Sequence, residues 1–476
     1  MNLTLDARKI NGFSELEIPR LNKLIEVFNT HSHGNSEKNR YYEGKISLGE
    51  VNLGIALPEN IKGLEIGCAW GAKCVDVLAA RSMFDGFVGT NGEDVKILDE
   101  IAVNNDLIAE YMKACRDELK YGCTFATLSS DDEIGVKIRF HSPQTAAGLW
   151  NGEKGRIDCG MAIIDSVQDE KEKESWIPSI INYYTDDAVW VLTRIKGDYW
   201  SASYNPHLMN RPLIEPLIWN ATSNKPFGRS RIKEPIRRLI QGYVRTIANA
   251  TIGLEFSTSP QKYLLGVTDE QYKVVINQKF KQYVGSIIAA TSNPETGQNP
   301  SFGQLMQGNI SPHVEMIRIL ATQFSAATGL TVTDTGVVSE ANPTSAEAVL
   351  AQSQTLIATA EQLNAGNGNA LRNIALMSQA IYSQVPLDDL TENQRDIMAH
   401  FKNPAMPSVA ATTDAAIKIV TARPEFANTD TFLEMIGFDK ATIRKIKAEE
   451  SRVRGLSLLT EMENEINADT SETNMG

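Results

Sequence analysis

The sequence predicts an α+β protein in which helices and antiparallel strands share the first part and helices dominate the second. Apolar and polar residues alternate around Val136, Ile138 and Phe140, and again in later segments up to about residue 205, as in half-buried strands. From residue 230 onward the apolar residues recur instead at helical spacing. Because no strand–helix–strand alternation accompanies the strands, we expect an antiparallel sheet.

The size and charge of the chain limit the classes of function that it can have. Its 476 residues are enough for two or more domains, or for one domain with large insertions. With 42 % hydrophobic and 22 % charged residues, the composition is that of a soluble globular protein. The net charge of −13 and the pI near 5.1 argue against a protein that grips nucleic acid through its phosphates. They do not exclude a protein that surrounds DNA without holding it.

Cysteine usage and hydropathy indicate a cytosolic protein. The five cysteines are odd in number and form no CxxC pair, which indicates reduced thiols. The opening segment MNLTLDARKINGFSELEIPR carries charges throughout, so we expect no signal peptide. The sequence contains no run of about eighteen apolar residues, and we therefore expect no membrane span.

Three helices and several strands are expected in the first half. The helices are predicted over residues 14–30, 70–82 and 98–121. The polar segment THSHGNSEKNR, which follows the first of them, is expected to be a loop. Strands are expected at GMAIIDSV, DAVWVLTRI and YWSASYNP, which continue the alternation.

Two helices flank an insert in the middle of the chain. Residues 230–257 predict one helix about 40 Å long, followed by a compact insert over 258–308. The second helix is expected to begin with Ser311 as its N-cap and Pro312 at its first position. Gly329 is expected to end it.

A polar loop then leads into a long helix built largely from small residues. The spacing of Thr344 and Glu347 is that of a capping box. One face of the segment stays apolar, but Gly366–Gly368 interrupts it. We therefore predict a kinked helix of about forty residues.

The last ninety residues are expected to be helical. A short helix is predicted to end at Gly437, and Asp439 is predicted to cap a charged helix after it. The tail over residues 467–476 is expected to be disordered.

One segment raises the possibility of an enzyme. GLEIGCAWG resembles the first motif of class I methyltransferases, in which glycines let the backbone approach S-adenosylmethionine. Glu65, Gly67 and Gly71 match that motif, but Ala69 stands at its middle position. Since no strand–helix alternation follows, we favour a turn that enters a helix with Trp70 in the core. A methyltransferase is the alternative.

The sequence contains no Walker A, GxSxG or HExxH motif. His31 and His33 fall in the polar loop and are expected to be solvated rather than to bind a metal. The groups Asp131–Glu133 and Asp388–Asp389 are expected at turns, as turn and cap residues. We therefore predict no catalytic, cofactor or metal site.

Two groups of basic residues each allow two interpretations. They are either solvated faces with ion pairs between subunits, or contacts for phosphate. The first group, at the start of the long helix, is Arg229, Arg231, Lys233, Arg237 and Arg238, and the second, in the insert, is Lys262, Lys273, Lys279 and Lys281.

The order of these elements resembles that of the portal proteins of tailed bacteriophages. The likeness covers roughly residues 40–450 and rests on an ordered set of segments rather than on one motif. The segments are WGAKCVDVLAARSMFDGFVG (70–89), LIAEYMKACRDELKYGCTFATLSSDDEIGVKIRFHSP (107–143), KPFGRSRIKEPIRRLIQGYVRTIANATIGLEFSTSPQKYLLG (225–266), PSFGQLMQGNISPHVEMIRILATQFSAATGLTVTDTG (300–336) and NPTSAEAVLAQSQTLIATAEQL (342–363).

The resemblance implies a portal fold with an α+β wing, a two-helix stem, a small α/β clip, a long kinked helix and a helical C-terminal crown. The implied parts are the wing (1–228), the first stem helix (229–257), the clip (258–308), the second stem helix (309–330), the tunnel loop (331–343), the long kinked helix that forms the wing spine (344–384), and the crown with its disordered tail (385–476).

The resemblance also implies a non-enzymatic role. Portal proteins form a homo-oligomeric ring, usually of twelve subunits, at one vertex of the capsid, and double-stranded DNA passes through it without sequence-specific contacts. The implied partners are the terminase large subunit, the head-tail connector or adaptor, the major capsid protein and the scaffold, with no membrane. The implied location is the virion, after assembly of a procapsid in the host bacterial cytoplasm.

The implied sites follow the same parts. The tunnel loop would lie nearest the duplex, and its lack of Lys and Arg suits a wall along which DNA slides. Its residues are Thr333, Asp334, Thr335, Gly336, Val337, Val338, Ser339, Glu340 and Asn342. The basic face of the stem would be Arg237, Arg238 and Arg245, and the four lysines of the insert would form the clip's contact with the terminase or connector.

The small residues of the long helix suit a ring, because they let neighbouring helices approach closely around a closed circle. They are Ala346, Ala348, Ala351, Ser353, Ala358 and Ala360. The alternative is an Ala-rich core helix in a monomer.

Overall fold

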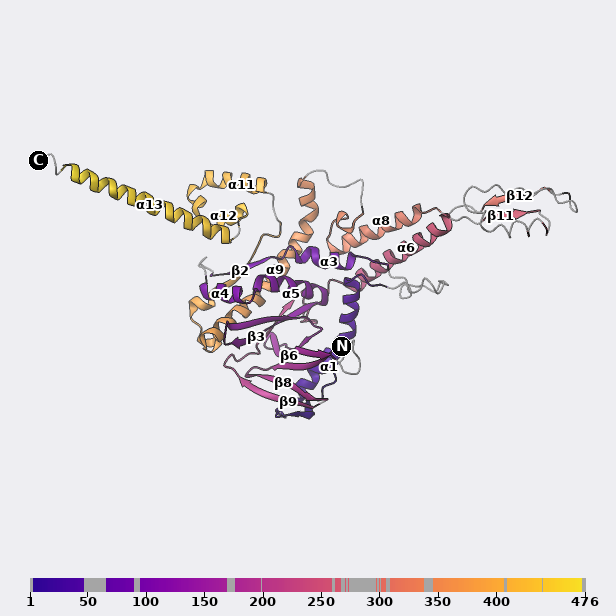
Figure 1. Cartoon of the computed structure of the whole chain (residues 1–476), viewed down its shortest axis with the longest axis horizontal. Helices are drawn as coiled ribbons and strands as arrows, with labels where there is room; N and C mark the ends of the chain where they lie inside the picture. Colours follow the sequence, from indigo (N-terminus) through magenta and orange to yellow (C-terminus); the bar gives the residue numbers. More distant parts are fainter. Residues whose placement is uncertain are drawn as a thin grey trace.

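A computed structural model gives the structure of the chain. It describes residues 3–46, 66–89, 95–168, 176–197, 199–258, 262–266, 301–304, 309–337, 346–405, 409–438 and 440–472, with residues 270, 273, 297 and 299. A body of sheets and helices carries two long projections, one on each side (Figure 1). The body combines helices with antiparallel sheets, as the predicted α+β class requires.

The larger sheet has six strands in the order β1-β9-β8-β7-β6-β5. Its neighbours are antiparallel, except that the short β1 runs parallel to β9. The three segments predicted from alternation form β6, β8 and β9, so that prediction is confirmed. The strands are β1 (Ile10–Asn11), β5 (Ala146–Asn151), β6 (Arg156–Gln168), β7 (Trp176–Tyr184), β8 (Ala188–Lys196) and β9 (Tyr199–Pro206).

The register of this sheet explains its core. Ile181 of β7 lies opposite Ile163 of β6 on one side and Leu192 of β8 on the other. All three side chains are buried, and they share a cluster with Leu24 and Phe28. Those two residues lie on α1 (Ile18–Tyr42), which therefore packs its apolar side against the sheet.

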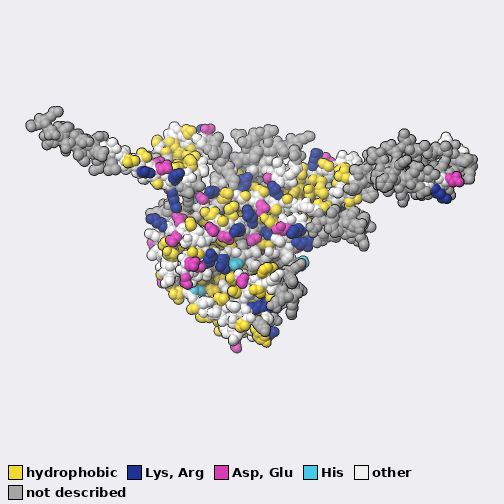
Figure 2. All heavy atoms as spheres, in the orientation of Figure 1, with side chains coloured by type: hydrophobic (Ala, Val, Ile, Leu, Met, Phe, Trp, Pro, Cys, Tyr) yellow, Lys and Arg dark blue, Asp and Glu magenta, His cyan; other side chains and the backbone are white. Residues whose placement is uncertain are grey.

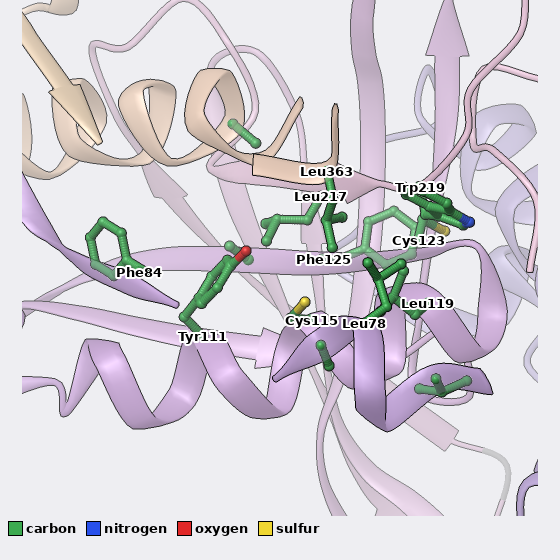
Figure 3. Packing of buried hydrophobic residues seen from close by; sticks show 14 of the residues in the cluster. Leu78, Phe84, Tyr111, Cys115, Leu119, Cys123, Phe125, Leu217, Trp219 and Leu363 are labelled. Carbon is green, nitrogen blue, oxygen red and sulfur yellow. The ribbon is translucent and has the colours of Figure 1, made fainter. Parts of the chain in front are cut away.

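A second, three-stranded sheet has the order β10-β3-β4. Its strands are β3 (Cys123–Asp131), β4 (Gly135–His141), which was predicted, and β10 (Ile214–Ile218). The helices α5 (Leu107–Tyr121) and α9 (Ala346–Ser383) pack against it. Figure 3 shows the resulting core, in which Tyr111 of α5 and Phe125 of β3 lie together with Leu363 of the distant α9.

The prediction of a loop at THSHGNSEKNR is wrong, because α1 continues through this segment to Tyr42. The helix is held there by tertiary contacts that the polar sequence does not reveal. Asn35 is buried, and its side-chain amide donates to the carbonyl of Pro143 at 3.2 Å. Tyr41, in the last turn, is also buried.

The helix predicted over 98–121 is divided in two, α4 (Lys96–Asn104) and α5. Asn105 and Asp106 separate them, and Asp106 has a φ of 47°. The buried Asn105 side chain donates to the carbonyls of Ile101 and Val136 and accepts from the N–H of Ile138 at 2.8 Å. The break therefore joins α4 to the edge of β4. The preceding helix, α3 (Trp70–Ala79), lies within its predicted range.

One projection consists of the helix pair α6 (Glu234–Thr258) and α8 (Ser311–Thr328), with β11 (Lys262–Leu265) and β12 (Ser301–Gln304) at its far end (Figure 1). We call this projection the arm. The predicted helix pair is confirmed.

Two details of the arm differ from the prediction. α6 begins at Glu234 rather than at residue 230, because the backbone of Arg231 is bonded to Leu119 and the hydroxyl of Ser230 to the carbonyl of Lys120. Ser311 is the first helical residue of α8 rather than its N-cap. Gly329 ends α8 with a φ of 73°, as predicted.

The long helix predicted at about forty residues is α9, which has 38 residues and is helical through Gly366–Gly368; the kink at these glycines stays a prediction. An added Cβ would make ordinary van der Waals contact at both glycines, so packing does not require either of them. The position of a Cβ on Gly368 would lie 3.6 Å from the ring of Phe401, and that on Gly366 would lie 4.0 Å from the carbonyl of Ile218. Asn367, between them, is fully buried. The predicted cap residue Thr344 lies outside the described residues.

The C-terminal part is not wholly helical, since β13 (Ile397–Phe401) pairs with β2 (Phe84–Gly89) in a two-stranded sheet. The edge-to-face contact of Phe401 with Phe84, at 5.9 Å, anchors this strand in the body. The sequence did not predict it, because the strand is short and lies between helices.

The helices that follow β13 form the second projection, which ends with the long α13 (Figure 1). Gly437 ends α12 with a φ of 107°, as predicted. α13 extends to Glu472, so the first six residues of the tail predicted as disordered are helical; the segment lacks Gly and Pro. Asp439 lies outside the described residues. These helices are α11 (Val409–Ala422), α12 (Asp430–Ile436) and α13 (Lys440–Glu472), whereas the short α10 (Glu392–Arg395) lies against α9.

Candidate functional site

The root of the arm is built around Trp70, the first residue of α3. Its ring stacks on Phe324 of α8 at 4.8 Å and contacts Tyr243 of α6 at 4.5 Å. Its indole N–H donates to the carbonyl of Thr335 at 3.2 Å. Gly242 of α6 leaves room for Leu320 of α8, since a Cβ there would lie 3.2 Å from it. One side chain thus ties both helices and the following loop to the body.

Arg231 reinforces this root, although the sequence placed it in a group that could contact phosphate. Its guanidinium is buried and donates to two backbone carbonyls, those of Cys74 and of Thr328, the latter at 2.6 Å. Burial lowers the pKa of Arg231. Its role is therefore structural.

The other arginines of the stem are held by carboxylates or lie partly covered. Arg237 pairs with Glu37 of α1 and with Glu234 at 3.2 Å. Arg238 also pairs with Glu234, at 3.0 Å. Arg245, further along α6, is half-buried. Arg237 and Arg238 therefore form ion pairs within the chain, whereas the sequence interpretation had placed such pairs between subunits.

The arm exposes apolar side chains along one flank of α8. Met316 is 44 % exposed and Ile319 51 %, and Ala326 is exposed about two turns after Ile319. Spacings of three and seven residues place these side chains on the same side of a helix. Figure 2 shows hydrophobic side chains gathered over the arm. We call Met316, Ile319 and Ala326 the apolar flank; Leu254 of α6 is also 44 % exposed.

The predicted tunnel loop is described only in its first part. Thr333–Thr335 forms a 3-10 turn, and Gly336 follows with a φ of 82°. The carboxylate of Asp334 accepts from the N–H and the hydroxyl of Thr331, at 2.9 and 2.8 Å. Val337 packs against the main core. The loop therefore leaves the root of the arm in a fixed direction. Its other predicted residues, Val338, Ser339, Glu340 and Asn342, lie outside the described residues.

The predicted clip contact is likewise partly described. β11 and β12 pair antiparallel, with Tyr263 opposite Gly303. Lys262 is the first residue of β11, and Lys273 is exposed. Lys279 and Lys281 lie outside the described residues.

The segment that resembled a methyltransferase motif serves helix packing. A Cβ on Gly71 would collide with the carbonyl of Tyr41, so the glycine lets α3 approach the end of α1. Trp70 lies in the core, as favoured above. Across the described residues, the one parallel strand pair is β1 with β9, which leaves no βαβ unit to hold S-adenosylmethionine. Residues 63–65 lie outside the described residues. The methyltransferase alternative finds no support.

A buried polar centre joins α9 to α5, and sequence reasoning missed it. The side-chain amide of Asn367 donates to the carboxyl of Glu118 at 2.7 Å and to the hydroxyl of Tyr111 at 3.0 Å. That hydroxyl lies 2.7 Å from the hydroxyl of Ser82. Burial raises the pKa of Glu118 to about 8. Near neutral pH this carboxyl group therefore holds a proton and remains uncharged in the core.

The small residues of α9 divide between two surroundings. Ser353 and Ala360 are buried against the chain's own core, which is the monomer interpretation. Ala351 and Ala358 are exposed on the other side, where a neighbour could approach. The side chains of Ala346 and Ala348 are outside the described ones.

The other residues singled out from the sequence lie on a helix or in turns. His31 and His33 lie on α1 and not in a loop. Asp131 accepts two backbone N–H groups in the β3–β4 turn, and Asp388 lies in a 3-10 turn, as predicted. Among the described residues no group of three or more His, Cys, Asp or Glu side chains could hold a metal ion. All five cysteines are buried and free.

Of the helices that the structure describes, none has the length and apolarity needed to cross a membrane.

Comparisons with known proteins give structural neighbours alone. No protein-family model and no curated protein matches the sequence. One similar solved chain is from the neck of an empty GTA particle computed with C6 symmetry: 13 % identity, TM-score 0.46, covering 74 % of this chain and 86 % of that one. Two others, from the virion of a native gene transfer agent (GTA) particle and from its neck computed with C12 symmetry, each have 12 % identity and a TM-score of 0.45. Each covers 78 % of this chain and 89 % of the other.

Proposed function

We propose that the chain is a portal protein: a non-enzymatic subunit that assembles with identical copies into a ring at one vertex of a phage-type capsid. The ring would form the channel through which double-stranded DNA is packaged and ejected. The order of body, first long helix, strand pair, second long helix, loop and spine supports this proposal, since it follows the order of the family's wing, stem, clip, stem, tunnel loop and wing spine.

The observation that carries the proposal is the apolar flank of the arm. A helix pair that projects from a body and leaves Met316 and Ile319 about half exposed has not buried its hydrophobic surface. A second copy placed head to tail would cover this flank, and a head-to-tail interface closes into a ring when its rotation fits. The ion pairs of Arg237 and Arg238 would then keep the stem from gripping phosphate.

The proposed partners follow from the same assignment. The strand pair at the end of the arm would meet the terminase large subunit during packaging and a head-tail connector later. The body would face the major capsid protein and the scaffold. The acidic balance of −13 suits a channel that lets DNA slide, because each added cation at its wall would release counterions and strengthen binding.

The test measures the mass of the full-length chain at high concentration by light scattering, alone and with scaffold protein. We expect a large homo-oligomer. Ile319→Arg, which places a charge in the apolar flank, should shift the mass toward the monomer, because burying an unpaired charge is costly.

The matched control is Val103→Arg on α4, where an equally apolar side chain is 75 % exposed outside the arm. It should leave the mass unchanged. A wild-type chain that stays monomeric even with scaffold protein would overturn the proposal, as would an Ile319→Arg variant that assembles like the wild type.

A further inference from the structure

A pocket of about 540 Å³ lies where α1, β5 and the segment 225–233 before α6 come together. Its floor is apolar and includes Phe28, Phe125 and Phe227. The described side chains that line it include no Asp or Glu. Six of them are basic: His31, Lys38, Lys225, Arg229, Lys233 and Arg237. Figure 2 shows Lys and Arg side chains gathered where α1 approaches the base of α6.

Lys38 is the most informative of these groups. Its ammonium is half-buried and donates to two neutral oxygens, the side-chain oxygen of Asn35 and the carbonyl of Tyr121, each at 3.1 Å. Within the described part of the chain, no carboxylate lies within ion-pair distance of it. Burial lowers the pKa of the Lys38 ammonium, and Arg237 and Lys225 lower it further, while Cys123 and Glu37 act in the opposite direction. A cation that has lost water and makes no ion pair with a described carboxylate favours an incoming anion.

The rim shows which cations are available to such an anion. Arg237 is already paired with Glu37 and Glu234. Lys225, Arg229 and Lys233 are exposed, and no described carboxylate pairs with them. Together with Lys38 on α1, they bring unpaired positive charge to an apolar pocket from two separate elements, in a chain whose net charge is −13.

We propose that this pocket binds an acidic peptide segment of a partner protein. An aromatic or large aliphatic side chain would occupy the floor, and Asp or Glu residues on either side of it would meet Lys38 and the exposed cations of the rim. The pocket is complete within one chain, so this binding does not depend on ring assembly.

The arrangement favours a peptide over a nucleic acid or a nucleotide. An extended peptide advances about 3.4 Å per residue, so carboxylates before and after an apolar residue are spaced to meet cations from both elements. A nucleotide concentrates its charge at one end of the molecule. The apolar floor offers nothing to the backbone of a duplex, whose phosphates bind best to exposed cations.

The test titrates the full-length chain into three fluorescein-labelled hexapeptides and measures anisotropy. The first is Asp-Glu-Phe-Leu-Asp-Glu, the second replaces its acids by Asn and Gln, and the third replaces Phe-Leu by Ser-Ser. We expect the first to bind at least about tenfold more tightly than the other two, with an affinity that falls as salt is added.

Substitutions test whether the peptide binds in this pocket. Lys225→Glu lies at an exposed position and should weaken the first peptide about tenfold, whereas Lys23→Glu, an exposed lysine of α1 outside the pocket, should leave it unchanged. Lys38→Met should also weaken it, and is interpreted only if its melting temperature stays near that of the wild type. Equal binding of the three peptides, or wild-type affinity in Lys225→Glu, would overturn the proposal. Displacement of the peptide by an equal concentration of ATP would assign the pocket to nucleotides instead.

Discussion

The body buries a core of apolar side chains, whereas the arm leaves part of its apolar side chains exposed. In the body, the helices α5 and α9 bury Tyr111 and Leu371 completely, and even the polar Asn367 is fully enclosed and hydrogen-bonded. In the arm, α8 buries Phe324 on one side and leaves Ile319 about half exposed on the other. The body therefore holds itself together, whereas the arm presents a surface that a second molecule can cover.

Trp70 is the boundary between these two regions, and removing it should have the largest effect. Trp70→Ala deletes ring contacts with α6 and α8 and the hydrogen bond to Thr335. We expect a loss of about 3–5 kcal/mol in the free energy of unfolding, measured by urea denaturation. Trp70→Phe keeps most of the ring contact and should lose far less. Equal losses in the two variants would mean that the ring contacts do not hold the arm to the body.

A change of pH should also distinguish the body from the arm, through the buried carboxyl group of Glu118 in the body. Because the pKa of Glu118 is raised in the folded chain, the folded state keeps a proton that the unfolded state, with a pKa of about 4.3, has lost. Below the unfolded-state pKa, this carboxyl group makes its full contribution to the stability of the folded chain. The contribution is lost as the pH rises through about 8. Glu118→Gln removes the titration and should stabilise the chain by about 2–3 kcal/mol at alkaline pH, but not near pH 5, by thermal denaturation.

Glu234→Gln is the matched change on the arm, at an exposed ion pair. Its melting profile should follow that of the wild type at every pH. If Glu118→Gln also gave a parallel profile, the carboxyl group would not be protonated in the core.

Two glycines of one motif test whether it serves packing. Gly71→Ala must push α3 away from the carbonyl of Tyr41 and should cost about 1–3 kcal/mol. Gly67→Ala has open space around the added methyl group and should cost much less. Urea denaturation measures both. A larger loss in Gly67→Ala would contradict the packing interpretation.

The smallest expected effect concerns the loop beyond the arm. If duplex DNA passes this loop, Thr333→Lys adds a cation to its path and should lower the velocity of DNA packaging in vitro. Thr333→Gln, of similar size and without charge, is the control. Equal velocities in the lysine and glutamine variants would place the loop away from the DNA.

Three asparagines explain most of what the sequence did not predict. Asparagine favours turns over helix interiors, and the sequence placed Asn35 in a loop, Asn105 inside a helix and Asn367 at a kink. In the structure each is buried, and its amide binds another element. Such bonds join residues far apart in the sequence, so no local pattern reveals them.

Sequence patterns predicted the structure correctly where interactions between residues close in the sequence determine it. Alternation located β6, β8 and β9, and αL glycines ended α8 and α12 as predicted. The candidate sites were harder, because spacing does not distinguish a buried arginine from an exposed one. Arg231 and Arg229 stand two residues apart, yet one clamps backbone carbonyls and the other lines the rim of a pocket.

The central claim is that identical copies cover one another's arms around an open channel. Negative-stain microscopy of the concentrated full-length chain, with scaffold protein present, tests it most directly. The account predicts closed rings with a central hole wide enough for duplex DNA, and their loss in Ile319→Arg. Particles that are solid at the centre, or single subunits under all these conditions, would contradict it.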